Sequence, residues 1–106
     1  MQFKDLVIKA LEIRDVYGKY EEKTYGKRWT KENTAEGLVG DVGDLMKLVL
    51  AKQGVRQIEE VDKKIAHELS DCLWSIIVLA QFYNVDLESS FLQNMDELKS
   101  FIESKT

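Results

Sequence analysis

Apolar residues recur every three or four positions along most of this chain, which is the period of an amphipathic α-helix. Four stretches carry the pattern, and they cover 3–23, 33–53, 58–83 and 87–102. No stretch alternates polar and apolar residues in the way that a half-buried strand does. We therefore expect an all-α protein.

The ends of these stretches carry the signals of helices joined by short connections. Asn33 and Glu36 are spaced like the two members of a capping box at the start of the second helix. Gly54 can take the left-handed conformation that ends a helix, and Asp86 is placed to cap the fourth helix. The chain has no proline and only six glycines, so few residues would break a helix. Short connections between four such helices predict an antiparallel four-helix bundle.

The third helix is expected to be the centre of that bundle. Between 72 and 80 it is apolar on nearly every face, as in a helix that its neighbours cover on all sides. This run is far shorter than the ~20 residues that span a bilayer. The N-terminal residues lack the charged-then-apolar order of a secretory signal. We therefore expect neither a membrane span nor export.

Length and charge narrow the picture further. The 106 residues fit one domain over 1–106, and a second copy of the chain is expected to complete any cleft, with a homodimer as the smallest assembly. The formal net charge of -4 does not favour binding to nucleic acid or to an anionic membrane. The only cysteine, Cys72, cannot form an internal disulfide and lies in an apolar run, which is typical of a buried thiol in the reducing cytoplasm.

Four acidic residues lie at the edges of the apolar stripes and not on the opposite, solvated faces. Asp41 and Asp44 are three residues apart on the second helix, and Glu68 and Asp71 repeat this spacing on the third. Residues three apart on a helix project to the same side. Each pair is therefore expected to face the neighbouring helix.

Clustered carboxylates close to a core repel one another and need a cation, a proton or water to be tolerated. A hard dication would satisfy all of them, and oxygen ligands favour Mg²⁺ whereas zinc favours histidine and cysteine. The single histidine, His67, precedes Glu68, and a di-iron bundle would need a Glu-x-x-His motif on two helices. The pattern predicts a Mg²⁺ site held by Asp41, Asp44, Glu68 and Asp71.

A more ordinary interpretation stays open for either pair alone. Acids at the edge of a helical stripe are usually solvated or paired with lysines. The neighbouring lysines are Lys47, Lys52, Lys63 and Lys64. Two such pairs on consecutive helices favour the metal site.

The segments 33–45, NTAEGLVGDVGDL, and 67–74, HELSDCLW, resemble the MazG-like nucleotide pyrophosphohydrolases. The resemblance covers roughly residues 25–98. That family is marked by a Glu-x-x-Glu pair on one helix and a Glu-x-x-Asp pair on the next, in a four-helix fold that usually assembles as dimers or tetramers. The 23 residues between Asp44 and Glu68 suit its spacing.

The resemblance implies a Mg²⁺-dependent hydrolase that cleaves a (deoxy)nucleoside triphosphate to the monophosphate and pyrophosphate, in nucleotide-pool house-cleaning. It implies that Asp41, Asp44, Glu68 and Asp71 are both the metal ligands and the catalytic residues. The metal would neutralise charge on the phosphates, and a carboxylate of the set could accept a proton.

The resemblance also suggests residues that bind the nucleotide. Trp29 matches a position where relatives place an aromatic side chain near the base, and Asn33 is expected to face the cleft. Their alternatives are a surface-packed tryptophan and a helix cap. Lys27, Arg28 and Lys31 crowd the loop before the second helix and could balance triphosphate charge, and a merely solvated loop is their alternative interpretation. On the fourth helix only Asn94 and Lys99 are candidates.

The sequence departs from the family pattern in two places. Aspartates replace both glutamates of the leading pair, and the fourth helix is acidic and has no arginine. A second interpretation is therefore a non-catalytic nucleotide-binding or regulatory helical dimer with a degenerate metal site. A purely structural bundle is disfavoured, because its inward acids would lack a compensating partner.

Overall fold

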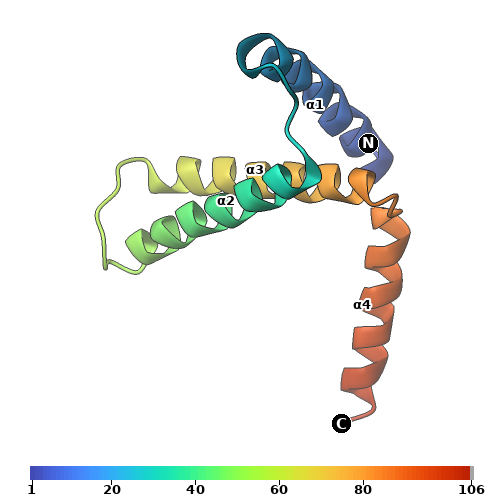
Figure 1. Ribbon diagram of the computed structural model, residues 1–106. Coiled ribbons are helices and arrows are strands. Elements are labelled where there is room, and N and C mark those ends of the chain that lie inside the picture. Colours follow the sequence, from blue (N-terminus) through green and yellow to red (C-terminus); the bar gives the residue numbers. More distant parts are fainter. Residues whose placement is uncertain (106) are drawn as a thin grey trace.

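The computed structural model describes residues 1–105, and these form four α-helices (Figure 1). The helices are α1 (Phe3–Tyr25), α2 (Lys31–Lys52), α3 (Val61–Phe82) and α4 (Leu87–Glu103). None of the described residues lies in a strand. The all-α class is therefore confirmed, and each helix lies close to its predicted range.

The helix ends follow the signals in the sequence, except at the start of α2. The carboxylate of Asp86 accepts the Ser89 N–H at 3.2 Å and caps α4, as expected. α2, however, begins after Thr30, whose hydroxyl accepts the Asn33 N–H while Asn33 Oδ1 accepts the Thr30 N–H. The prediction that Asn33 caps this helix together with Glu36 was wrong. Both pairs have the spacing of a capping box, and the earlier pair adds three residues to the helix.

α3 is the element against which α1 and α2 pack. α2 and α3 lie side by side and antiparallel, and α1 crosses the C-terminal half of α3 (Figure 1). The Trp74 indole N–H donates to the Ala10 carbonyl at 3.0 Å, and the Tyr17 ring lies 5.9 Å from the Trp74 ring. The buried apolar side chains mark these contacts, and they are Ala10, Leu48, Cys72, Ile77 and Val78.

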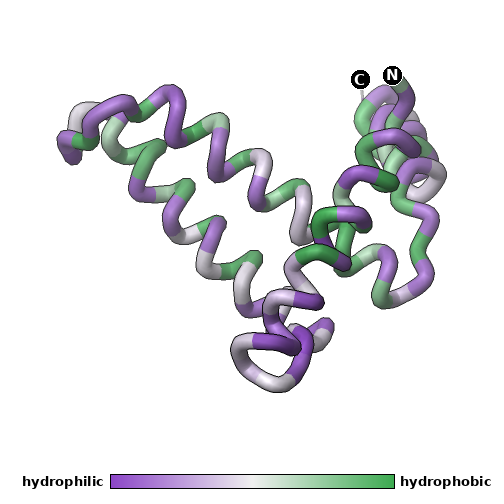
Figure 2. The backbone as a smooth tube through the Cα atoms, turned by 90° about the horizontal axis from the view of Figure 1, so that it is seen from above, coloured by the Kyte–Doolittle hydropathy of each residue, from purple (hydrophilic) through white to green (hydrophobic). Residues whose placement is uncertain are grey.

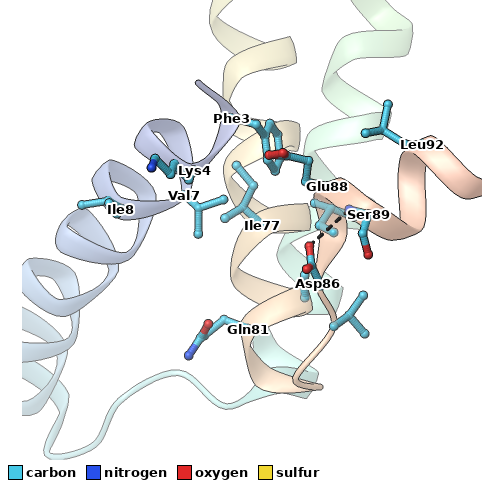
Figure 3. A pocket seen from close by; sticks show the side chains of 13 residues that line it. Phe3, Lys4, Val7, Ile8, Ile77, Gln81, Asp86, Glu88, Ser89 and Leu92 are labelled. Carbon is cyan, nitrogen blue, oxygen red and sulfur yellow. Dashed lines mark hydrogen bonds between the residues drawn. The ribbon is translucent and has the colours of Figure 1, made fainter. Parts of the chain in front are cut away.

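α4 leaves the C-terminal end of α3 and has no extensive contact with any other helix (Figure 1). Its first turn lines a hollow of about 450 Å³ together with Phe3 and Val7 of α1 and Ile77 of α3 (Figure 3). None of its described residues is buried. The radius of gyration is 17.0 Å, against about 13 Å for a compact domain of this length. Within one chain, the four helices do not enclose a common core.

One face of α3 is uncovered, so the prediction that its neighbours cover it on all sides was wrong for a single chain. Leu69, Leu73 and Ile76 follow one another along this face and are 53%, 42% and 40% exposed. Figure 2 shows hydrophobic residues recurring along all the helices, including those that have few neighbours. Leu73 and Ile76 also line an apolar hollow of about 710 Å³ with Phe91 and Leu92 of α4. The hydrophobic periodicity predicts that this face is buried, but it does not say whether the same chain or another one covers it.

Among the described residues, α3 is also the one helix that is long and apolar enough to cross a membrane by length and composition. Every 18-residue window of this helix contains Glu68 and Asp71. Core helices of soluble proteins meet the same criterion, so it assigns no location by itself.

Candidate metal centre

The two predicted pairs of acids meet between α2 and α3. Asp41, Asp44 and Glu68 offer carboxylate oxygens that lie within 4.8 Å of one another. Glu68, Asp71 and the imidazole of His67 form a second group within the same limit. Glu68 belongs to both groups, so the four carboxylates form one acid cluster: Asp41, Asp44, Glu68 and Asp71. These groups lie close enough together to hold a metal ion.

Local sequence and helix direction together explain this meeting. The three-residue spacing places both acids of a pair on the same side of a helix. Because α2 and α3 run antiparallel and side by side, the two pairs meet, and Glu68 of α3 lies close to both Asp41 and Asp44 of α2. The buried Leu48 and Cys72 flank the acids on the two helices. The acid cluster therefore lies at the edge of the packed contact.

The electrostatics of the acid cluster are unfavourable without a cation. Burial raises the pKa of Asp41, and repulsion from Asp71 and Asp44 raises it further. Burial likewise raises the pKa of Glu68, with added repulsion from Asp41, Asp71 and Asp44. The pKa of the Cys72 thiol is raised by burial and then by the same acids. A bound cation would relieve this repulsion.

Glu68 holds an atom that lacks a partner. Its Oε2 is buried and accepts no hydrogen bond. Within the described part of the chain, it is the only buried side-chain nitrogen or oxygen in this condition. Leaving a buried acceptor unsatisfied costs about 1–3 kcal/mol, and more for a charged group. A cation placed among the carboxylates would satisfy this atom.

Lysines do not neutralise the acid cluster in the way that the ordinary interpretation requires. Lys47 Nζ lies 3.8 Å from Asp44 Oδ1, and both side chains are more than half exposed. In the described structure, no other lysine forms an ion pair with the acid cluster, since Lys52 pairs with Asp62. His67 Nε2 lies 3.2 Å from Asp71 Oδ2. Asp41 and Glu68 thus have no cationic partner of their own.

Two of the predicted nucleotide-binding residues lie together near the start of α2. Trp29 and Asn33 line a hollow of about 450 Å³ with Gly37. A Cβ atom at Gly37 would lie 2.8 Å from a ring carbon of Trp29, so glycine is what admits the indole here. Asn33 Oδ1 accepts the Thr30 N–H, so the side chain of Asn33 takes part in the capping box at the start of α2. The indole therefore packs one helical turn before Asp41.

The remaining nucleotide-binding candidates are not brought to the acid cluster within one chain. Lys31 lies in the first turn of α2, about 15 Å along the helix axis from Asp41, and its Nζ is 5.2 Å from the Tyr83 ring centroid. Asn94 and Lys99 are exposed on α4, which leaves from the far end of α3.

The pattern in the sequence gave no indication of the contact that fixes Trp29. The backbone N–H of Trp29 donates to Glu21 Oε1 at 2.8 Å, and the Glu21 carboxylate is paired with the Arg14 guanidinium. The side chain of Glu21 is only 7% exposed and that of Arg14 only 12%. Burial alone would raise the pKa of Glu21, but the hydrogen bonds from Arg14 and Trp29 outweigh it and hold the pKa below its usual value. The seven-residue spacing was the only available signal, and it looks like that of a solvated helix face.

Comparisons with protein-family models, with curated proteins and with solved structures find no match to this chain.

Proposed function

We propose that this protein is a Mg²⁺-dependent nucleoside triphosphate pyrophosphohydrolase of the MazG-like type, which converts a (deoxy)nucleoside triphosphate to the monophosphate and pyrophosphate. The observation that carries the proposal is the acid cluster, whose central residue, Glu68, holds a buried oxygen without a partner. Carboxylates are the protein ligands that Mg²⁺ prefers, and Mg²⁺ commonly binds a few of them together with substrate phosphates.

In this proposal the acid cluster binds the metal and handles the proton. Mg²⁺ supplies the positive charge that neutralises the phosphates. Water adds to the α-phosphorus, the bond from that phosphorus to the bridging oxygen breaks, and its electron pair leaves with pyrophosphate. A carboxylate of the acid cluster accepts the proton of the water. His67 holds the orientation of Asp71 through their 3.2 Å contact.

The nucleoside end is assigned to the hollow beside Trp29. The indole offers a flat face for the base, and its packing on Gly37 places it one turn from the metal ligands. Asn33 lines the same hollow, whereas Lys31, whose Nζ lies over the Tyr83 ring, would have to turn towards the nucleotide. Asn94 and Lys99 would reach a nucleotide only from the α4 helix of a second copy.

A nucleotide panel tests the activity. Purified protein is incubated with common and modified nucleoside triphosphates and Mg²⁺, and pyrophosphate release is measured. Turnover of at least one nucleotide that Asp71→Asn abolishes is expected. If no nucleotide is hydrolysed, the second candidate function, a nucleotide-binding or regulatory dimer, takes its place. The shorter aspartate arms on α2 favour that alternative, and tight nucleotide binding without turnover would support it.

The proposed assembly is a homodimer or homotetramer in which a second copy covers the apolar hollow between α3 and α4. Light scattering at micromolar concentration is expected to give at least twice the chain mass of 12.3 kDa. Phe91→Glu should shift the protein towards monomer, because Phe91 lines this hollow. Val39→Glu, on an exposed site of α2, is the matched control and should not. A monomeric wild-type protein would contradict the assembly.

The proposed location is the cytoplasm, where nucleoside triphosphates are found. The buried free thiol of Cys72 fits a reducing compartment.

A further inference from the structure

A second hollow, of about 370 Å³, opens beside the acid cluster where α2 ends and α3 begins. Asp44 and Glu68 of the acid cluster line it, and so does His67. Lysines from both helices line it as well, and we call it the lysine hollow after them: Lys47, Lys63 and Lys64.

The charges of the lysine hollow suit an anion once a dication is bound next to it. Within residues 1–105, Lys63 and Lys64 form no ion pair, and Lys47 contacts Asp44 at 3.8 Å. The lining carries three lysines against three carboxylates, those of Asp44, Glu60 and Glu68, while Asp41 and Asp71 do not line it. A dication bound by Asp44 and Glu68 would therefore leave the hollow with an excess of positive charge. Such an excess of cationic groups attracts phosphate oxygens.

The backbone at the start of α3 adds to this preference. Glu60 precedes the helix with φ +53° and makes no side-chain capping hydrogen bond. The N–H groups of the first turn therefore receive no cap from the chain. The N-terminal end of a helix carries a partial positive charge that favours anions.

The order of features along α2 gives the hollow its place in the reaction. Gly37 with the Trp29 indole comes first, the carboxylates of Asp41 and Asp44 follow, and Lys47 comes last. A nucleotide whose base lies against Trp29 and whose α-phosphate lies at the acid cluster would extend its terminal phosphates into the lysine hollow.

Resting on the proposed function, we propose that the lysine hollow binds the β- and γ-phosphates of the substrate and then the pyrophosphate product. Lys63 and Lys64 would contact phosphate oxygens, and the charge of the metal held by the acid cluster would attract the same phosphates. Affinity for inorganic pyrophosphate should consequently depend on both the lysines and Mg²⁺, whereas affinity for a nucleoside monophosphate should not depend on the lysines.

The test is calorimetric binding of inorganic pyrophosphate to the full chain, with and without Mg²⁺. The Lys63→Gln/Lys64→Gln double variant is expected to bind pyrophosphate at least about tenfold more weakly than wild type in Mg²⁺. Lys52→Gln, which removes a lysine outside the hollow, is the matched control and should bind like wild type. Thermal melting checks that each variant is folded.

Failure of the hollow and failure of the activity are distinguishable. Equal pyrophosphate affinity in the double variant and the wild type would overturn the lysine hollow, even if the nucleotide panel shows turnover. Lysine-dependent pyrophosphate binding without turnover of any nucleotide would uphold the hollow and remove the hydrolase. A double variant that weakens the monophosphate as much as pyrophosphate would also overturn it, because the lysines would then act as general surface charge.

Discussion

Replacing Glu68 with glutamine is expected to raise the melting temperature of the metal-free protein and to abolish its stabilisation by Mg²⁺. The glutamine keeps the shape of the side chain but removes a charge that burial and three neighbouring acids disfavour. We expect a gain of about 1 kcal/mol, or roughly 4–8 °C for a domain of this size. Nucleotide turnover should fall by more than about 100-fold, since mutating even a residue that only hydrogen-bonds to a metal ligand can lower activity 10–100-fold.

The pH dependence of this difference has a definite sign. The pKa of Glu68 is higher in the folded protein than its usual 4.5, so the folded state binds the proton more tightly than the unfolded state does. Its contribution to stability is therefore fully present below about pH 4.5 and is lost as the pH rises through the folded-state pKa. The melting-temperature advantage of Glu68→Gln should be largest near neutral pH and should shrink as the pH falls. Mg²⁺ stabilisation of the wild type should shrink in the same direction, because protons compete for the ligands.

Glu59→Gln is the matched control for this prediction, because Glu59 is an exposed glutamate in the loop before α3. It removes the same charge without touching the acid cluster, and it should keep the Mg²⁺ response. Two results would count against the metal centre: a metal-free Glu68→Gln protein that melts below wild type, or one that Mg²⁺ still stabilises.

Features set by short-range spacing were predictable from the sequence. The helices depend on a three-to-four-residue period, and the acid cluster depends on two pairs with that spacing on consecutive antiparallel helices. Neither needs knowledge of distant contacts. The start of α2 was the local exception, because Thr30 with Asn33 and Asn33 with Glu36 offer the same capping geometry.

Features set by contacts between distant residues were not predictable in the same way. The apolar face of α3 at Leu69 and Leu73 looked like the face of a covered helix, but the pattern does not say that the cover lies outside this chain. Likewise, α4 has the periodicity of a packed helix and packs on almost nothing here. Lys63 and Lys64 were, in the alternative interpretation, neutralising partners of the acids. In the described structure they line the hollow beside the acid cluster without forming an ion pair with it.

Removing the carboxylate of Glu21 is expected to destabilise the protein more than any other single change to its charged residues. Glu21→Ala would leave the Arg14 guanidinium, whose side chain is 12% exposed, without its partner. It would also leave the Trp29 N–H without an acceptor. Breaking a buried ion pair from one side costs about 3–5 kcal/mol, or more than about 10 °C in melting temperature.

The double variant Arg14→Met/Glu21→Leu separates the stranded charge from the worth of the pair itself. It should recover most of the loss, because two apolar side chains need no partner, and the remaining deficit of about 1–3 kcal/mol would belong to the backbone N–H of Trp29.

The pH dependence of the Glu21 contribution should be opposite to that of Glu68. The pKa of Glu21 is lowered in the folded protein, so its stabilisation is present above the usual value of 4.5 and is lost as the pH falls through the folded-state pKa. Folded variants should keep their Mg²⁺ response, since the acid cluster lies on α2 and α3. A single variant that melts like wild type would mean that the pair is solvated and does not hold Trp29 in place.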